Sequence, residues 1–241
     1  DLKAESGAKD LLKLIEILFP SYGLTGAEAH FNNLAGQYWT GLAKLLHFFI
    51  NYDPSWLGEF GLKPVFSIGS VVDLYSNIDR ELILSKREDL EGTKGLDENA
   101  LYHLRDALTK IREYHETEDE QRSSIDGSFR KKMSLFYLPT VRKCTDGNDF
   151  DLRQLRREDI TVYVGVNAED MSLAYDFLNL FFNFVVEVTL RENPDFDPTL
   201  KHDCLMFLDE FPSIGYMPII KKGSGYIAGF KLKLLTIYQN I

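Results

Sequence analysis

Residues 201–218, "KHDCLMFLDEFPSIGYMP", contain a short apolar run that ends directly in two carboxylates, Asp209 and Glu210. This order is typical of a Walker B strand, in which a buried strand carries acidic residues to the carboxyl end of a parallel sheet. The chain of 241 residues contains no G-x-x-x-x-G-K-[ST] phosphate-binding loop. The sequence therefore presents one half of a nucleotide-hydrolysis site without the other half.

The residues around this motif predict an α/β domain over residues 141–241. Runs rich in β-branched and apolar residues indicate strands buried on both faces, and a long apolar segment between two of them indicates a helix. The predicted order is strand, helix, strand, helix, strand, at residues 160–166, 171–193, 204–210, 217–229 and 233–239. This alternation is typical of a doubly wound parallel sheet. Three strands would make that sheet incomplete.

The first 140 residues predict an all-α domain, because their apolar residues recur at helical spacing and no strand-like alternation is found. The expected helices cover residues 8–20, 26–54, 98–115 and 116–139, with two shorter helices between residues 69 and 89. Residues 90–100 form a loop, which closes on Asp97 as a helix cap. Trp39 and Trp56 are expected to be core residues.

Composition limits the classes of function. The net charge is −10, and residues 1–140 alone carry 22 acidic against 16 basic residues, a net of −6. This balance argues against a large non-specific nucleic-acid surface, which needs clustered Lys and Arg. The five histidines are scattered, so a metal site built by protein side chains is not expected. The two cysteines lie far apart and show no redox-motif spacing, so a reducing compartment is expected.

The two ends of the sequence suggest a fragment of a longer protein. The chain starts "DLKAESGAKD" without Met and stops at "LLTIYQNI", inside an apolar run. We therefore expect the phosphate-binding loop to lie outside the given sequence. No apolar run reaches the ~20 residues that a membrane span needs, so no span is expected within it.

Three residues are candidates for the chemistry of nucleotide hydrolysis. An Asp at the end of a Walker B strand holds Mg²⁺ through water, and the acid that follows orients or deprotonates the attacking water. These roles fit Asp209 and Glu210. Gln239 ends the neighbouring predicted strand, where its amide can hydrogen-bond a γ-phosphate or the lytic water. The alternative is that two acidic residues follow a strand by chance and have no catalytic role.

Three long stretches resemble one known family, the type IV secretion coupling proteins of the TraG/TraD type. "FLDEFPSIGYMPIIKKGSGYIAGFKLKLLTIYQ" (207–239) is similar to the family's segment from Walker B to the sensor glutamine. "SFRKKMSLFYLPTVRKCTDGNDFDLRQLRREDITVYVGV" (128–166) resembles its return from a helical insertion into the sheet. "AGQYWTGLAKLLHFFINY" (35–52) is similar to its tryptophan helix. Within the family, the chain most resembles the coupling protein of a Cag-type effector secretion system.

The resemblance implies a fold and a function. Family members are hexameric ATPases anchored in the inner membrane, with a RecA-like P-loop motor that acts on its cytoplasmic face using ATP and Mg²⁺. They bring effector proteins or a relaxase–DNA complex to the secretion channel. Residues 1–140 would be the all-α domain inserted in the motor, where adaptors, chaperones or regulatory subunits dock. Residues 141–241 would be part of the RecA-like domain.

The family's functional residues can be placed on this chain by the same resemblance. Asp209 matches the Mg²⁺-associated acid, Glu210 the catalytic acid and Gln239 the sensor glutamine. Some relatives place an arginine finger between Walker B and the strand that ends in the sensor glutamine. In this chain no Arg follows Arg191, and the cations available there are lysines: Lys221, Lys222, Lys231 and Lys233. This departure leaves the origin of a trans-acting cation open.

Other polar groups and other functions remain as alternatives. Arg153, Arg156 and Arg157 are expected on a surface helix with ion pairs, and residues 130–132, "RKK", on a solvated helix face or a basic rim. His202 and Asp203 are expected to be a loop pair rather than catalytic groups. The chain could act as a non-catalytic protein-interaction module, or belong to a DNA-translocating motor of conjugation or chromosome transport. Without a phosphate-binding loop, the chain alone should not hydrolyse ATP.

Overall fold

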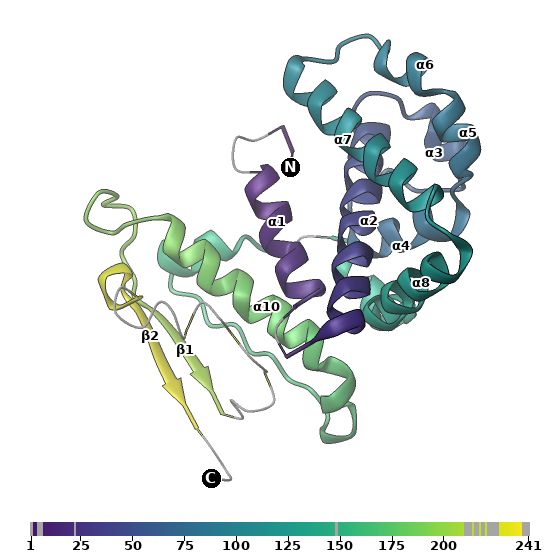
Figure 1. Ribbon diagram of the computed structural model, residues 1–241. Coiled ribbons are helices and arrows are strands. Elements are labelled where there is room, and N and C mark those ends of the chain that lie inside the picture. Colours follow the sequence, from purple (N-terminus) through teal and green to yellow (C-terminus); the bar gives the residue numbers. More distant parts are fainter. Residues whose placement is uncertain are drawn as a thin grey trace. The chain divides into compact units, whose positions relative to one another are not determined.

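The computed structural model describes residues 2–3, 7–21, 23–147, 149–209, 214, 217, 220 and 227–237. The chain divides into two compact units, Asp1–Gly147 and Asn148–Ile241. The first unit is helical and the second contains a parallel strand pair (Figure 1). Each unit has buried apolar residues of its own.

The first unit is built around one long helix, α2 (Gly26–Asn51). Helix α2 packs against α1 (Gly7–Leu18), α4 (Ile68–Asn77), α7 (Glu98–His115) and α8 (Asp119–Met133). The large side chains of α2 that are at most 1% exposed point in several directions, as expected for a helix with neighbours on many sides: Tyr38, Trp39, Leu42, Leu45, Leu46 and Phe49. The remaining helices of this unit are α3 (Ser55–Glu59), α5 (Arg80–Ser85), α6 (Arg87–Glu91), η1 (Ser134–Tyr137) and α9 (Pro139–Thr145).

Most helices of this unit were predicted from the sequence. Helix α7 has the predicted bounds, and the predicted cap is confirmed, because the Asp97 carboxylate accepts a hydrogen bond from the Ala100 N–H at 2.7 Å. The segment expected to hold two short helices holds three instead, α4, α5 and α6. The Asp79 carboxylate accepts from the Leu82 N–H at 3.0 Å and starts α5 as a separate helix. Trp39 is buried as expected, and half-buried Trp56 stacks on Phe49.

The second unit packs one long helix on one face of a two-stranded sheet. Its elements are η2 (Leu152–Arg156), η3 (Ala168–Asp170), α10 (Met171–Arg191), β1 (Cys204–Leu208), η5 (Ile227–Phe230) and β2 (Leu232–Thr236). Figure 1 shows β1 and β2 side by side with α10 along them. The core joins the C-terminal half of α10 to the strands through Val185, Val186, Cys204, Met206, Leu208 and Leu232.

Two predictions about the sheet were wrong. Residues 160–166 are not a strand, and among the described residues the sheet has two strands, not three. Residues 161–165 of this segment are exposed, with Tyr163 at 90%. A strand needs a neighbour that accepts and donates its backbone hydrogen bonds, and no described segment pairs with residues 160–166. Apolar composition alone therefore did not make a strand here.

Strand β1 was also expected to be buried on both faces, but only one face is covered. Cys204, Met206 and Leu208 point into the core, whereas Leu205 is 60% and Phe207 is 56% exposed. Because successive side chains of a strand point to opposite faces, a helix on one side buries alternate residues only. The fold class is thus mostly helical, with a small parallel sheet in place of the predicted larger one.

Helix α10 has two properties that are relevant to membranes. Residues Leu173–Arg191 are long and apolar enough to cross a membrane by length and composition, with a mean hydropathy of 1.4, although no such segment was expected. In the structure, however, the helix packs on the sheet, and its Asn183 and Thr189 side chains are buried with hydrogen bonds to α10 carbonyls. In this structure the C-terminal half of α10 thus forms part of the core of the second unit.

The predicted helix at 217–229 lies mostly outside the described residues. Its described positions include Met217, which is buried in the core of the unit, and Ile227, with which the 3₁₀ helix η5 begins. The predicted strand at 233–239 is observed as β2, whose bounds are Leu232–Thr236.

Candidate functional site

The candidate site lies at the carboxyl edge of the parallel strand pair. Strands β1 and β2 are in register from Cys204 opposite Leu232 to Leu208 opposite Thr236. The Ile237 N–H donates to the Leu208 carbonyl at 2.9 Å, so the pairing continues to the ends of both strands. Residues that follow the two strands therefore emerge side by side at one edge, the place where ligand sites form in parallel sheets.

Asp209 occupies this edge as predicted. It follows the last residue of β1 directly, and its side chain is exposed. An exposed carboxylate at a strand end has the oxygen donors that Mg²⁺ prefers and room for water between the metal and the protein. Its position is therefore compatible with a water-mediated metal contact.

The other two predicted site residues, Glu210 and Gln239, lie outside the described residues. Their sequence positions follow the two adjacent strand ends, one residue after Asp209 and three residues after Thr236. Their assignment as catalytic acid and sensor glutamine therefore stays a prediction. Lys221 and Lys222 also lie outside the described part of the chain.

Asp203 and His202 lie at the opposite, amino end of β1. The Asp203 carboxylate forms an ion pair with Lys233 of β2 at 2.6 Å, and this contact lowers the pKa of Asp203 below its ordinary value. The His202 N–H donates to the Arg156 carbonyl at 3.0 Å. This loop pair is thus separated from Asp209 by the whole length of the strand.

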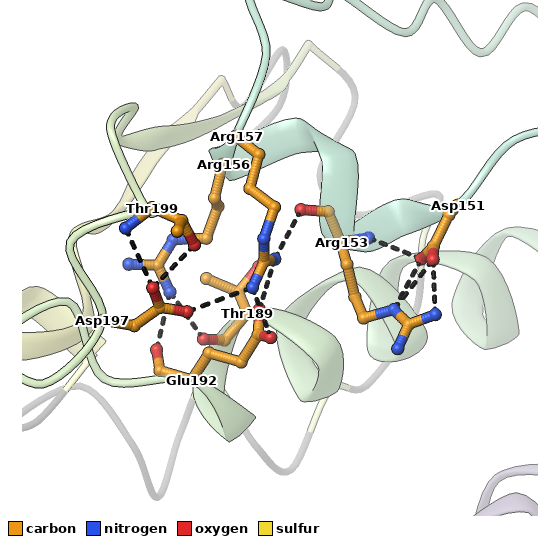
Figure 2. A network of polar contacts seen from close by, with 8 residues as sticks. All are labelled: Asp151, Arg153, Arg156, Arg157, Thr189, Glu192, Asp197 and Thr199. Carbon is orange, nitrogen blue, oxygen red and sulfur yellow. Dashed lines mark hydrogen bonds and ion pairs between the residues drawn. The ribbon is translucent and has the colours of Figure 1, made fainter.

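A network of polar contacts anchors the entry to β1 and the end of α10 (Figure 2). Arg156 is its buried centre, with 2% of its surface exposed. Its Nη1 donates to the carbonyls of Thr189 at 2.9 Å and Glu192 at 2.8 Å, at the end of α10. Since the last carbonyls of a helix have no partner within the helix, the guanidinium acts as a C-terminal cap.

The prediction that Arg156 lies on the surface was wrong, whereas its neighbours form ion pairs as predicted. Arg157 makes two hydrogen bonds of 2.8 Å to the Glu192 carboxylate, and Arg153 binds Asp151. Burial lowers the pKa of Arg156, and its Nε and Nη2 have no hydrogen-bond partner among the described residues. The network therefore combines one costly buried cation with a half-buried ion pair, Arg157–Glu192, and an exposed one, Arg153–Asp151.

One polar cluster in the first unit was not predicted as a site. Arg130 of the "RKK" stretch donates from its Nε to the Tyr75 hydroxyl at 3.2 Å, and Tyr75 in turn donates to Asp126 at 2.8 Å. Tyr75 and Asp126 are 51 residues apart in the sequence, so no local pattern indicated this cluster. Among the described residues, no group of three or more His, Cys, Asp or Glu side chains could hold a metal ion.

Comparisons with known proteins show which family this sequence matches. A family model described as type IV secretory system conjugative DNA transfer matches residues 1–241. The chain is 28% identical over 130 residues to the conjugal transfer protein TraG of Escherichia coli, which covers 51% of this chain and 20% of TraG. It is 31% identical over 109 residues to VirD4 of Agrobacterium fabrum, which covers 45% of this chain and 16% of VirD4. The chain thus aligns with at most a fifth of these curated relatives' length.

Proposed function

Because this chain belongs to the type IV secretion coupling protein family, we propose that it is the Walker B portion and the helical domain of an ATP-driven coupling protein. The whole protein would act at the cytoplasmic face of the bacterial inner membrane as a homohexamer. It would bring substrates to a type IV secretion channel and drive their transfer. The observation that supports this most directly is Asp209 at the shared carboxyl edge of β1 and β2.

Asp209, together with Glu210 and Gln239 by their positions in the sequence, supplies residue types that would suit a magnesium–nucleotide complex. When bound, Mg²⁺ would neutralise charge on the transferred phosphoryl group. Asp209 would hold the metal through a water molecule, Glu210 would orient and deprotonate the attacking water, and Gln239 would hydrogen-bond the γ-phosphate. A G-x-x-x-x-G-K-[ST] loop would have to come from elsewhere in the protein, since these 241 residues contain none.

The proposal is tested by ATP turnover of the full-length protein. Glu210→Gln and Asp209→Asn should each lower the rate of ATP hydrolysis at least 100-fold, because each removes a carboxylate that acts in the reaction. Asp203→Asn is the matched control, since it removes a carboxylate at the other end of the same strand, and it should leave the rate within about twofold. Normal hydrolysis by Glu210→Gln would refute the role proposed for that residue.

The nature of the cargo is a separate part of the proposal. The description of the family, conjugative DNA transfer, supports a nucleoprotein such as a relaxase–DNA complex. The net charge of −6 in residues 1–140 instead favours proteins as the direct ligands of the helical unit. We therefore propose that effectors, adaptors, chaperones or regulatory subunits dock on the helical unit, while any DNA contacts other parts of the protein. Salt-dependent binding of duplex DNA to this chain would contradict this division.

A further inference from the structure

The first unit contains an open cleft with a volume of about 900 Å³. The cleft is lined by the C-terminal ends of α4 and α7, the start of α5, one face of α8 and the 3₁₀ helix η1. Its lining is rich in tyrosine and arginine: Tyr75, Tyr114, Tyr137, Arg80, Arg122 and Arg130. Among the described residues that line the cleft, Asp126 is the only carboxylate.

Two of the three arginines, Arg80 and Arg130, each form a hydrogen bond through Nε alone, which leaves Nη1 and Nη2 of the guanidinium available. The Nε of Arg80 donates to the Tyr38 hydroxyl at 2.7 Å, and its guanidinium lies over the Tyr114 ring, 5.1 Å from the centroid. The Nε of Arg130 donates to the Tyr75 hydroxyl at 3.2 Å. Neither residue forms a hydrogen bond through Nη1 or Nη2 with any described residue.

The negative charge in the cleft is already engaged. Oδ1 of Asp126 accepts hydrogen bonds from the hydroxyls of Tyr75 at 2.8 Å and Tyr114 at 2.6 Å. Burial, followed by the hydrogen bond to Asp126, raises the pKa of Tyr75 to about 12, so this phenol stays protonated and remains a donor. Arg122 is also engaged, with the His115 and Thr117 carbonyls and with Asp119. Asp126 also attracts both Arg80 and Arg130, but one carboxylate is shared by two guanidinium groups, so a positive charge remains for a ligand.

We propose that this cleft binds a peptide segment that carries one or two carboxylates beside an apolar side chain. A guanidinium binds a carboxylate through two parallel N–H groups, and the two free forks match that geometry. Tyr75 and Tyr114 are themselves buried, but the Tyr137 ring, which lines the cleft and is 43% exposed, offers the flat apolar surface that a neighbouring peptide side chain needs. The site deepens the docking role proposed above for the helical unit by giving it a place and a ligand chemistry.

The surroundings of the cleft favour a short peptide over a nucleic acid. The connection from α7 to α8 borders the cleft and is strongly acidic, with Glu116, Glu118, Asp119 and Glu120 in five residues. A long phosphodiester backbone would meet this acidic border, whereas a peptide with one or two carboxylates would contact only the arginines. The net charge of −6 over residues 1–140 also disfavours a nucleic acid as the ligand.

The test uses the whole 241-residue chain labelled with ¹⁵N and a probe of known sequence. The probe is the capped octapeptide Gly-Ser-Glu-Glu-Phe-Leu-Ser-Gly, and its control has Gln-Gln in place of Glu-Glu. We expect the glutamate peptide to shift the Nε–H resonances of Arg80 and Arg130 in a saturable manner. The glutamine peptide should bind at least tenfold more weakly. No saturable shift up to millimolar peptide, or equal binding of both peptides, would overturn the proposal.

Variants of the exposed Arg130 separate a binding role from a structural one. Arg130→Gln should weaken binding of the glutamate peptide at least tenfold. Arg130→Lys should restore part of the affinity, because lysine keeps the positive charge but not the two parallel N–H groups. Arg105→Gln, an exposed arginine of α7 outside the cleft, is the control and should change the affinity less than twofold. A 12-nucleotide single-stranded DNA is tested in the same way. If it binds more tightly than the peptide and loses affinity in Arg130→Gln, the ligand of the cleft is a nucleic acid and the peptide proposal is overturned.

The outcome is independent of the proposed ATPase role. Asp209→Asn should leave peptide binding unchanged, because Asp209 belongs to the second unit and the cleft to the first. Failure of the peptide experiment would therefore leave the ATPase proposal intact, and the reverse also holds.

Discussion

At the scale of single residues, His47 shows how burial sets the response to acid. Its imidazole is buried on α2 and meets the Phe66 ring edge-on, with the ring centroids 5.9 Å apart. Burial, aided by nearby positive charge including Lys3, lowers the pKa of His47 from its ordinary 6.5 to about 4. The folded protein therefore keeps this imidazole neutral at pH values where the unfolded chain protonates it.

This difference predicts a loss of stability in mild acid. A lowered pKa contributes stability that is present above pH 6.5 and is lost as the pH falls towards 4, by on the order of 3 kcal/mol. His47→Gln removes the titrating group, so urea unfolding at pH 7, 5.5 and 4 should show a correspondingly weaker pH dependence. The exposed His30 gives the control, because His30→Gln should follow the wild-type profile. An unchanged profile in His47→Gln would mean that other groups cause the acid loss.

Arg156 gives a second prediction at this scale. Replacement by Ala removes a fully buried side chain and leaves the Thr189 and Glu192 carbonyls without their donor. We expect Arg156→Ala to lower the free energy of unfolding by about 3 kcal/mol. Arg153→Ala, which removes an exposed ion pair with Asp151, should cost less than about 0.5 kcal/mol. Similar losses for both variants in urea unfolding would contradict the cap role of Arg156.

The contrast between these residues shows what sequence could predict. The position of Asp209 follows from a local pattern, because an apolar run that ends in acids places them at a strand end. The burial of Arg156 depends on carbonyls 33 and 36 residues away, and no local pattern carries that information. The Tyr75, Asp126 and Arg130 cluster was missed for the same reason.

At the scale of elements, the contact between α2 and α7 depends on a glycine. A Cβ on Gly41 would lie 2.9 Å from the Lys110 Cβ and 3.3 Å from the Ala107 carbonyl oxygen. Gly127 of α8 is also inside a helix, but a Cβ there would meet no atom within 4 Å. The two positions thus form a matched pair that differs in available space.

Alanine at these positions should have opposite effects. Gly127→Ala should raise the free energy of unfolding by about 0.5–1 kcal/mol, because Ala is the better helix former. At Gly41 the same gain is offset by overpacking of about 1–3 kcal/mol, so Gly41→Ala should be net destabilising. Thermal unfolding of the two variants and the wild type at neutral pH measures whether each substitution raises or lowers the stability. A stabilising Gly41→Ala would show that the two helices separate easily.

Elements also differ in how much of their formation is local. Helix α7 has its own cap, Asp97, and its own apolar stripe, so its bounds were predicted from sequence. Residues 160–166 have the composition of a strand but lack a paired neighbour among the described residues, and most of them remain exposed. Strand formation depends on a partner segment, and that dependence explains why this prediction failed.

At the scale of the whole molecule, the two cysteines allow the stability of each unit to be followed separately. Cys144 is exposed in the first unit, and Cys204 is buried in the second, where burial raises the pKa of its thiol. A buried thiol with a raised pKa reacts only when its surroundings open. In a Cys144→Ser background, the rate at which a thiol reagent labels Cys204 therefore reports the opening of the second unit alone.

Units with separate cores should open independently. Gly41→Ala destabilises the first unit, so it should change the labelling rate of Cys204 less than twofold. Arg156→Ala destabilises the second unit, and a loss of about 3 kcal/mol corresponds to an increase in labelling of about 100-fold when opening and closing are fast. If Gly41→Ala instead accelerated labelling of Cys204 in proportion to its effect on stability, the chain would unfold as one cooperative structure. The boundary at Gly147 would then separate two compact units that still unfold together. In that case a ligand bound in the arginine–tyrosine cleft would also stabilise the strand pair that carries Asp209.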